Sequence, residues 1–459
     1  MRGSRWSYGK GVCLLAMVLL GTSLAPVAQT PPEPVEVGVD NRQSATGAPL
    51  TLTLQGAIAR ARKNDPEYRA ALTDFGVSKQ ERVASRAALL PNVNYNAQFL
   101  YTEGNGSPAG RFIANNGVHE YLSQGNVHQE FSLAHVADYQ RSAAAEAVAK
   151  ARVEIAGRGL VLTVVQAYYG LVVSERKYAT AERANDEAQR FLQISQKLEQ
   201  GGEVARSDVI KAQLQSQQKE RDLSEAQLEM ERSRVELAVL LFPDFNQDFT
   251  VVDDLEMPET LLTFPEVQAA AADKNPQLRA ALAAVREANQ QVAGARYGFL
   301  PSLNVDYFYG IDANRFATRE FDPASGRDVR NLGYAATATL QLPIWDWGAH
   351  RSRLKQADLR RDQAKVELSF AQRKMLGDLR MFYQEAQTAR LELDSWHKSA
   401  EGAAESLRLT TLRYQAGEAT VLEVVDAQNT LTQARNAYDD GQVRFRVAMA
   451  NLQTLTGNL

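Results

Sequence analysis

The stretch Pro91-Asn92-Val93-Asn94-Tyr95-Asn96-Ala97-Gln98-Phe99-Leu100-Tyr101 decides the fold class of this 459-residue chain. Every second residue from Val93 to Tyr101 is apolar or aromatic, and most residues between them are amides. Strands of about ten residues with one apolar and one polar face are typical of transmembrane β-barrels that line water. The sequence therefore predicts a barrel strand. A soluble sandwich is the alternative, in which helices would cover the sheet.

Three further segments continue this pattern, at 120–133, 302–311 and 332–342, although the first of them alternates less cleanly. The segments 103–119 and 312–331 then become exposed loops. Four strands cannot close a barrel, and lipid does not tolerate open sheet edges, so the chain must oligomerise. Two copies would give eight strands and a filled interior, whereas three would give twelve and room for a passage, which suits the amide-lined face. The residues expected near the membrane surfaces are Tyr95, Tyr101, Tyr121, Tyr307, Tyr334, Trp345 and Trp347.

The chain repeats itself at a nearly fixed distance. Asn64-Asp65-Pro66 recurs as Lys274-Asn275-Pro276, and Leu90-Pro91 recurs as Leu300-Pro301. A repeat of this length is far longer than the units of solenoid proteins, which run about 20 to 50 residues. We therefore expect a first structural repeat over 51–262 and a second over 263–459.

Long proline-free intervals predict long helices. Proline is absent from 109–242 and from 344–459, and interior proline costs a helix about 3 kcal/mol. A continuous helix over 137–200 would extend about 95 Å at roughly 1.5 Å per residue. Apolar residues at steps of three and four give the last segment a heptad seam with polar interruptions at Gln428, Arg435 and Gln442. A structural coiled-coil envelope protein is the alternative, but it would not need amide-lined strands, and a passive porin would not need the helices.

The amino-terminal segment has the features of an export signal. Arg2, Arg5 and Lys10 precede a short apolar run, so residues 1–28 are expected to be a signal peptide, cut after Ala28 or alternatively after Ala25. Residues 29–50 contain several prolines and are expected to form an extended tether. Because the single cysteine lies inside the signal, the mature chain should contain no disulfide.

The composition argues against several other functions. The net charge of −4 does not favour nucleic-acid binding. The histidines show no zinc-ligand spacing, and there is no phosphate-binding glycine loop or nucleophile elbow, so no metal, no cofactor and no enzymatic activity are expected. No stretch after the leader offers about 18 uninterrupted apolar residues, which argues against a helical membrane span.

The order of elements resembles the TolC family of bacterial outer-membrane efflux and secretion channels over nearly all of the mature chain. The most specific segments are Leu342-Pro343-Ile344-Trp345-Asp346-Trp347-Gly348, Arg413-Tyr414-Gln415-Ala416-Gly417-Glu418 and Leu422-Glu423-Val424-Val425-Asp426-Ala427-Gln428. The resemblance implies an α+β membrane protein, namely a homotrimer with a twelve-stranded barrel in the outer membrane and a coiled-coil tunnel in the periplasm. It also implies a periplasmic adaptor, an inner-membrane transporter and outer-membrane lipid as partners.

The function implied is the exit duct of a tripartite efflux pump that passes small molecules to the outside. The channel of a type I protein secretion system is the alternative, and the sequence does not reveal the substrate. Two turns match the tips of the tunnel, and the residues expected to dock the adaptor there are Gly202, Glu203, Gly417 and Glu418.

A periplasmic gate is carried over from the family in the same way. The expected gate residues are Asp208, Tyr414, Glu423 and Asp426. Glu423 and Asp426 lie three apart, on one side of a helix, so threefold symmetry would place six carboxylates at the narrowest point. Such a ring attracts cations. A basic partner is missing because Ala419 stands at its position, and Arg206 is a candidate to replace it.

Overall fold

The computed structural model describes residues 50–101, 119–256, 260–322 and 325–457. The predicted signal peptide, nearly all of the predicted tether and all of the predicted 103–119 loop except His119 lie outside the described residues. The description below concerns the compact unit that begins at Pro49.

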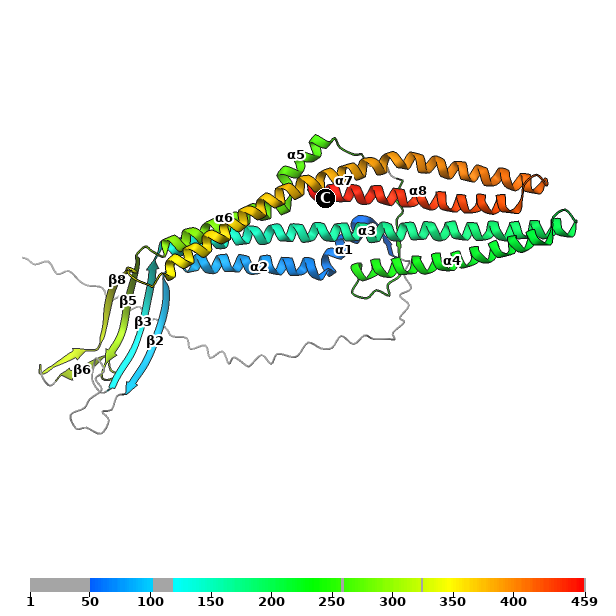
Figure 1. The fold of residues 1–459 in the computed structure, drawn as a ribbon. Helices are drawn as coiled ribbons and strands as arrows, with labels where there is room; N and C mark the ends of the chain where they lie inside the picture. Colours follow the sequence, from blue (N-terminus) through cyan, green and yellow to red (C-terminus); the bar gives the residue numbers. More distant parts are fainter. Residues whose placement is uncertain (1–49, 102–118, 257–259, 323–324, 458–459) are drawn as a thin grey trace, which may run out of the picture. The chain divides into compact units, whose positions relative to one another are not determined.

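The described residues contain eight helices, which form two sets of matching lengths. Figure 1 shows their arrangement. The first set is α1 (Leu54–Asn64), α2 (Pro66–Ala87), α3 (Leu133–Gln200) and α4 (Arg206–Leu241). The second set is α5 (Phe264–Lys274), α6 (Pro276–Tyr297), α7 (Ala349–Gln415) and α8 (Val421–Thr456). Their lengths are 11, 22, 68 and 36 residues in the first set and 11, 22, 67 and 36 in the second. The long helices predicted from the proline-free intervals are therefore confirmed.

The repeated Asp-Pro and Asn-Pro motifs mark a joint between two helices in each set. Asp65 accepts a hydrogen bond from the backbone N–H of Tyr68 at 2.6 Å, and Asn275 accepts one from Leu278 at 2.9 Å. Both side chains cap the helix that follows, and the proline occupies the first helical position, where its missing N–H costs nothing. Each motif thus ends one helix and starts the next without an intervening loop.

The described strands form a four-stranded sheet and two small pairs. The large sheet contains β2 (Asn92–Tyr101), β3 (His119–Phe131), β5 (Ser302–Ala313) and β8 (Leu332–Gln341), all antiparallel in the order β2-β3-β5-β8. The small pairs are β1 (Leu50–Leu52) with β4 (Phe249–Val251) and β6 (Arg319–Asp322) with β7 (Arg327–Arg330). The four predicted barrel strands are confirmed, whereas part of the loop predicted at 312–331 forms the β6–β7 hairpin.

The register places polar residues on one face of the sheet and apolar residues on the other. Asn92, His128, Asp306 and Thr337 stand opposite one another across the four strands, and the next row consists of Val93, Val127, Tyr307 and Ala336. Residues that face each other in an antiparallel pair lie on the same side of the sheet. The first row therefore belongs to a polar face and the second row to an apolar face. Among the described residues β2 and β8 are the edge strands, and the sheet does not close on itself.

All helices that adjoin the sheet meet it at one edge. The starts of β2 and β5 and the ends of β3 and β8 lie together in the register, as the pairs Asn92–His128, Phe131–Leu303 and Ser302–Gln341 show. The ends of α2 and α6 and the beginnings of α3 and α7 therefore gather along what we call the helix-side edge of the sheet.

The helices pack side by side in a row, and the outermost helices of the row lie on the same sides of the chain as the edge strands of the sheet. α3 packs against α2, α4, α6 and α8, and α7 packs against α6 and α8. Near the sheet the order is α2-α3-α6-α7, and away from it the order is α4-α3-α8-α7. One side of the chain is consequently formed by β2, α2 and α4, and the other side by β8 and α7.

The main core surrounds the middle of α3. One described helix, α3, contains an 18-residue stretch with a mean hydropathy of 1.3, apolar enough to cross a membrane, and half of it is buried inside the protein. Val161, Val164 and Tyr168 are almost completely buried there. The hydroxyl of Tyr168 donates to the Val252 carbonyl at 2.7 Å, and burial raises the pKa of Tyr168 to about 12. These contacts fix the β1–β4 pair on α3.

Candidate functional site: the helix tips

Two glycine turns join the long helices to their shorter partners. Gly202 is the second residue after α3 and has φ 78°, and Gly417 is the second residue after α7 and has φ 77°. In each turn the next N–H reaches back five residues, from Glu203 to the Leu198 carbonyl and from Glu418 to the Arg413 carbonyl. This is the Schellman arrangement, in which the left-handed position favours glycine. The two tips predicted from the sequence are thus equivalent helical hairpins.

The two helices that leave these turns begin differently. Thr420 and Glu423 form a complete capping box, with the Glu423 carboxylate accepting the Thr420 N–H at 3.0 Å. Arg413 lies 3.6 Å from the same carboxylate. The hydrogen bonds from Thr420, with a smaller contribution from Arg413, lower the pKa of Glu423. At α4 the corresponding position is Ala205, which offers no side-chain cap. Glu423 therefore remains ionised at neutral pH and stabilises the start of α8.

The other predicted gate carboxylates lie near the starts of the same two helices, Asp208 in the first turn of α4 and Asp426 in the second turn of α8. Asp426 is exposed on α8 and makes no ion pair within the described part of the chain. Asp208 contacts Lys211 at 3.2 Å on α4. Arg206 is 86% exposed and lies 4.0 Å from Glu199, so within one chain it does not meet Glu423. Its role as a replacement for the missing basic residue stays a prediction.

Tyr414 faces the interior of the tip. It is 3% exposed, its ring lies 5.0 Å from that of Phe191, and its hydroxyl donates to the Ser195 hydroxyl at 3.1 Å. Ser195 in turn donates to the Phe191 carbonyl. Tyr414 thus joins α7 to α3 inside one chain, within an apolar cluster that draws on all four tip helices. That cluster contains Phe191, Ala212, Ala403, Leu407, Tyr414, Val421, Val424, Ala427 and Leu431.

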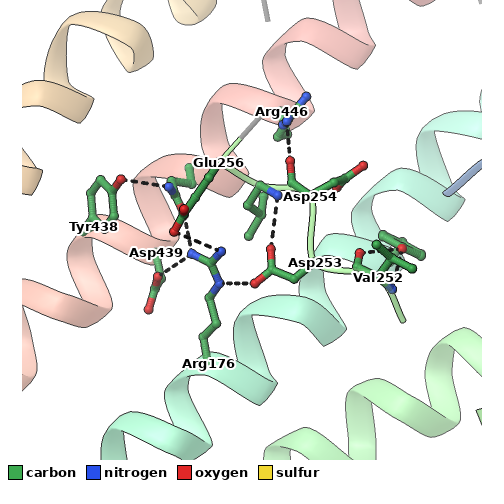
Figure 2. A network of polar contacts seen from close by, with 11 residues as sticks. Arg176, Val252, Asp253, Asp254, Glu256, Tyr438, Asp439 and Arg446 are labelled. Atoms are coloured by element: carbon green, nitrogen blue, oxygen red, sulfur yellow. Dashed lines mark hydrogen bonds and ion pairs between the residues drawn. The ribbon is translucent and has the colours of Figure 1, made fainter. Parts of the chain in front are cut away.

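A second polar site, not predicted from the sequence, ties the middle of α3 to α8 (Figure 2). Arg176 on α3 contacts Asp253 at 2.5 Å and Asp439 at 3.2 Å, and it donates to Gln442 at 2.7 Å. Glu256 lies 3.7 Å away. Burial raises the pKa of Asp439, although Arg176 acts against this shift. Gln442 was visible as a polar interruption of the heptad seam, but nothing in the sequence pairs it with Arg176.

Among the residues that the structure describes, no group of three or more histidine, cysteine or acidic residues is placed to hold a metal ion. The tip carboxylates belong to capping and surface contacts, and the Arg176 cluster is a structural junction. What the arrangement offers is a pair of charged helical hairpins attached to an open, two-faced sheet.

Comparison with known proteins bears directly on this architecture. A family model described as "Outer membrane efflux protein" matches residues 57–241 and 268–458. The alkaline protease secretion protein AprF of Pseudomonas aeruginosa is 23% identical over 87% of this chain and 83% of its own length. The outer membrane protein TolC of Vibrio cholerae is 24% identical over 87% of this chain and 89% of its own. The crystal structure of the CmeC outer membrane channel of Campylobacter jejuni has the same fold, with a TM-score of 0.75 at 19% identity, over 88% and 85% of the two chains.

These matches confirm the resemblance that the sequence motifs indicated. They also account for the two matching sets of helices, since the family model covers both. With most of its length matched, this chain belongs to the outer membrane efflux protein family and resides in the outer membrane, with its helices extending into the periplasm.

Proposed function

We propose that three copies of this chain form one exit duct, with a twelve-stranded barrel in the outer membrane and a helical tunnel in the periplasm. The edge strands β2 and β8 carry the proposal, because each has a single partner strand in the described part of the chain and lipid does not tolerate unpaired backbone groups. Four strands per copy give twelve in a trimer, which leaves room for a passage lined by the polar rows.

The helices support the same assembly, because exposed apolar side chains concentrate on the helices at the two sides of the row. On the β2 side they lie on α2 and α4, and on the β8 side they lie on α7. They are Leu72, Val77, Val83, Ile210, Leu214, Leu228, Val235, Val239, Leu359, Val366, Phe370, Leu376, Met381, Leu391, Trp396, Leu409 and Leu412. By contrast, the exposed large apolar residues of α3, a helix inside the row, are confined to its first turn. A neighbouring copy would cover both sides.

Light scattering of the detergent-solubilised protein tests the trimer. We expect a protein mass of three chains, and we expect it to fall in a variant with Leu214→Glu and Leu228→Glu on the α4 side. Gln213→Glu, an equally exposed change beside Leu214, is the matched control. A monomeric wild-type protein, or a double variant that remains fully trimeric, would contradict the proposed assembly.

The duct is proposed to carry small molecules from an inner-membrane transporter through a periplasmic adaptor to the outside. The family's description as efflux protein supports this cargo. Secretion of proteins is the second candidate, because the relative AprF is named for protease secretion. A host lacking its own ducts, supplied with this chain and its transporter and adaptor, should accumulate less fluorescent dye. Unchanged dye accumulation together with an exported polypeptide would favour secretion instead.

The gate is proposed to consist of Glu423 and Asp426, with Asp208 and Tyr414 supporting its closed form. Three copies would place six carboxylates around the entrance, and capping keeps the pKa of Glu423 low. In planar bilayers, Glu423→Gln with Asp426→Asn should reduce cation preference and block by divalent cations. The control is Glu367→Gln, which removes a carboxylate from the first half of α7, away from the proposed gate. Unchanged selectivity in the double variant would remove these two residues from the gate.

The tips are proposed to dock the adaptor at Gly202, Glu203, Gly417 and Glu418. Glu203 and Glu418 are exposed and make no ion pair within the described residues. Since the only cysteine lies in the predicted leader, Glu203→Cys and Glu418→Cys each introduce one thiol for photocrosslinking. Both should capture the adaptor, whereas Glu229→Cys on α4 should not. Equal capture at all three positions would place the contact elsewhere.

A further inference from the structure

A surface beside the sheet combines exposed indoles with unpaired cations. Between β8 and α7 the chain exposes Ile344 (87%), Trp345 (76%) and Trp347 (90%). The first two turns of α7 then add Arg351, Arg353 and Lys355, all exposed and none in an ion pair within the described chain. We call these six residues the basic-aromatic patch.

The indoles are held in place by a defined turn. The Asp346 carboxylate accepts the Gly348 N–H at 3.0 Å and the His350 N–H at 2.6 Å, and it also contacts the His350 ring. Trp347 adopts φ 56°, which is costly for a bulky residue, and its ring meets that of Trp345 edge to face at 5.7 Å. The turn therefore presents two fixed indoles rather than a loose loop.

This turn breaks the internal symmetry of the chain. In the first half Ser132 alone separates β3 from α3, and it caps that helix through the Ala134 N–H. In the second half seven residues separate β8 from α7, and they carry both tryptophans. The additional segment is thus not required to connect a strand to a helix, and it needs a separate explanation.

The cations are equally unexpected where they stand. Positive charges in the first turns of a helix oppose the helix dipole, and carboxylates are preferred there. Arg86 and Arg296, at the ends of α2 and α6, are also exposed and lack ion pairs in the described chain. The segments 82–91, 288–301 and 347–357 contain no aspartate or glutamate. The junction of β3 and α3 adds Glu130 and Asp138, but Asp138 pairs with Arg141 at 2.8 Å and Glu130 lies 3.8 Å from His135. The helix-side edge of the sheet therefore keeps a positive excess.

A second copy of the chain does not neutralise this excess. A neighbour would bring the end of its α2 beside β8 and α7, and residues 82–91 there contain no carboxylate. Of their two arginines, Arg82 is already paired with Glu146 at 2.7 Å, and Arg86 adds a further positive charge. Tryptophan favours the boundary between lipid and water, where its ring lies in apolar surroundings and its N–H can hydrogen-bond to water. Arginine and lysine beside it attract anionic headgroups. The apolar face of the sheet also continues to this edge, with Leu340 69% and Leu342 54% exposed.

We propose that the basic-aromatic patch binds the headgroups of anionic phospholipids in the leaflet that faces the periplasm. The indoles enter the boundary of the acyl chains, and Arg351, Arg353 and Lys355 contact the phosphates. The proposal rests on the membrane barrel of the proposed function. In the trimer, three patches surround the barrel where it meets the tunnel, and they fix its depth in the membrane.

The chain offers a direct optical test. Of its four tryptophans, Trp6 lies in the predicted leader, so Trp396→Phe leaves only Trp345 and Trp347 in the mature protein. This variant is reconstituted in vesicles of phosphatidylcholine and phosphatidylglycerol, with the bromine label on either lipid. Brominated phosphatidylglycerol should quench the fluorescence more strongly, because each cation near an anionic leaflet contributes roughly a fivefold preference. The preference should fall with added salt.

Two variants decide whether the patch is responsible. Adding Arg351→Gln, Arg353→Gln and Lys355→Gln should bring the preference close to one. The matched control removes the same charge about 30 Å farther along α7, at roughly 1.5 Å per residue, with Arg373→Gln, Lys374→Gln and Arg380→Gln, and should keep the preference. Equal quenching by the two lipids in the parent protein, or an unchanged preference in the patch variant, would overturn the proposal.

Two further outcomes separate the alternatives. Inorganic phosphate at a concentration matching the lipid phosphate should leave the preference intact; if it abolished the preference, the patch would be a site for free phosphate, contrary to the proposal. A protein with Trp345, Trp347 and Trp396 all changed to Phe and with Leu340→Trp reports on the sheet itself. Quenching there without quenching at the patch would overturn only the lipid site, whereas quenching at neither would overturn the membrane barrel.

Discussion

Removal of the Arg176 guanidinium should lower thermal stability measurably. In the variant Arg176→Ala, Asp439 keeps a carboxylate that is 11% exposed and loses its cation. Breaking a fully buried ion pair by deleting one partner costs about 3–5 kcal/mol. Because the Arg176 side chain is 21% exposed and that of Asp253 40% exposed, solvation by water offsets part of this cost. We therefore expect the free energy of unfolding to fall by about 3 kcal/mol per chain.

This loss translates into a shift of the melting temperature. An unfolding entropy of about 2.1 cal/mol/K per residue gives about 0.8 kcal/mol/K for roughly 400 ordered residues, so the melting temperature should fall by about 4 °C. If three chains unfold together, enthalpy and entropy scale alike and the shift is unchanged. The assay is circular dichroism in detergent at one fixed scan rate, because unfolding of such assemblies is often irreversible.

The pH dependence provides an independent check. The folded-state pKa of Asp439 is already raised, mainly by burial, so its contribution to stability declines as pH rises from the unfolded value, about 3.9, through the folded value. Without Arg176 the folded pKa of Asp439 rises further, and the decline extends to higher pH. The penalty of Arg176→Ala should therefore be larger at about pH 8 than at about pH 5.

Two comparisons can refute this reasoning. Lys177→Ala removes the neighbouring cation, whose partner Asp440 is 57% exposed, and should shift the melting temperature by about 1 °C or less. Adding Asp439→Asn to Arg176→Ala should recover most of the loss, because no unpaired charge is then buried. A double variant no more stable than Arg176→Ala, or a penalty that does not change with pH, would show that the cluster is not held together by charge.

Three further predictions concern the sheet and the tips. Gly310→Ala should prevent barrel assembly, because the added Cβ would lie 2.2 Å from a backbone oxygen of β3. The control is Gly333→Ala on β8, whose added Cβ meets nothing within 4 Å, so this variant should assemble normally. Detergent-resistant trimers on a gel distinguish the two variants. Gly417→Ala, at φ 77°, should cost about 1–2 kcal/mol, while Gly377→Ala in the interior of α7 should stabilise by up to about 1 kcal/mol. Tyr414→Phe should cost about 1 kcal/mol and raise the frequency of channel opening in bilayer recordings, and an unchanged melting temperature would argue against its hydrogen bond.

Local patterns were sufficient to predict the elements of this fold. The alternation from Val93 to Tyr101 predicted β2, and the absence of proline predicted α3 and α7, because both signals arise from the backbone geometry of single segments. The Asp65-Pro66 and Asn275-Pro276 motifs marked real helix joints for the same reason. By contrast, the β6–β7 hairpin lies in a segment rich in polar residues, where composition resembles that of a loop.

Contacts between distant segments could not be predicted. Arg176 meets Asp253 and Asp439, which lie 77 and 263 residues away, and their encounter depends on the relative rotation of α3 and α8. The inward orientation of Tyr414 has the same origin, since its partner Ser195 lies 219 residues away. A periodic pattern shows which residues share a helix face, but it does not show which residue of another helix that face will meet.

The unequal starts of α4 and α8 have a consequence for anything that approaches the tips. The Thr420 box protects the amides of the first turn of α8, whereas Ala205 leaves those of α4 to the solvent. The first turn of α4 should thus fray more readily and exchange its amide hydrogens faster. In the proposed trimer, helix starts that are firmly capped and helix starts that fray would alternate around the ring. The six similar turns would then be of two kinds, and the proposed adaptor would meet a rigid and a flexible one in turn.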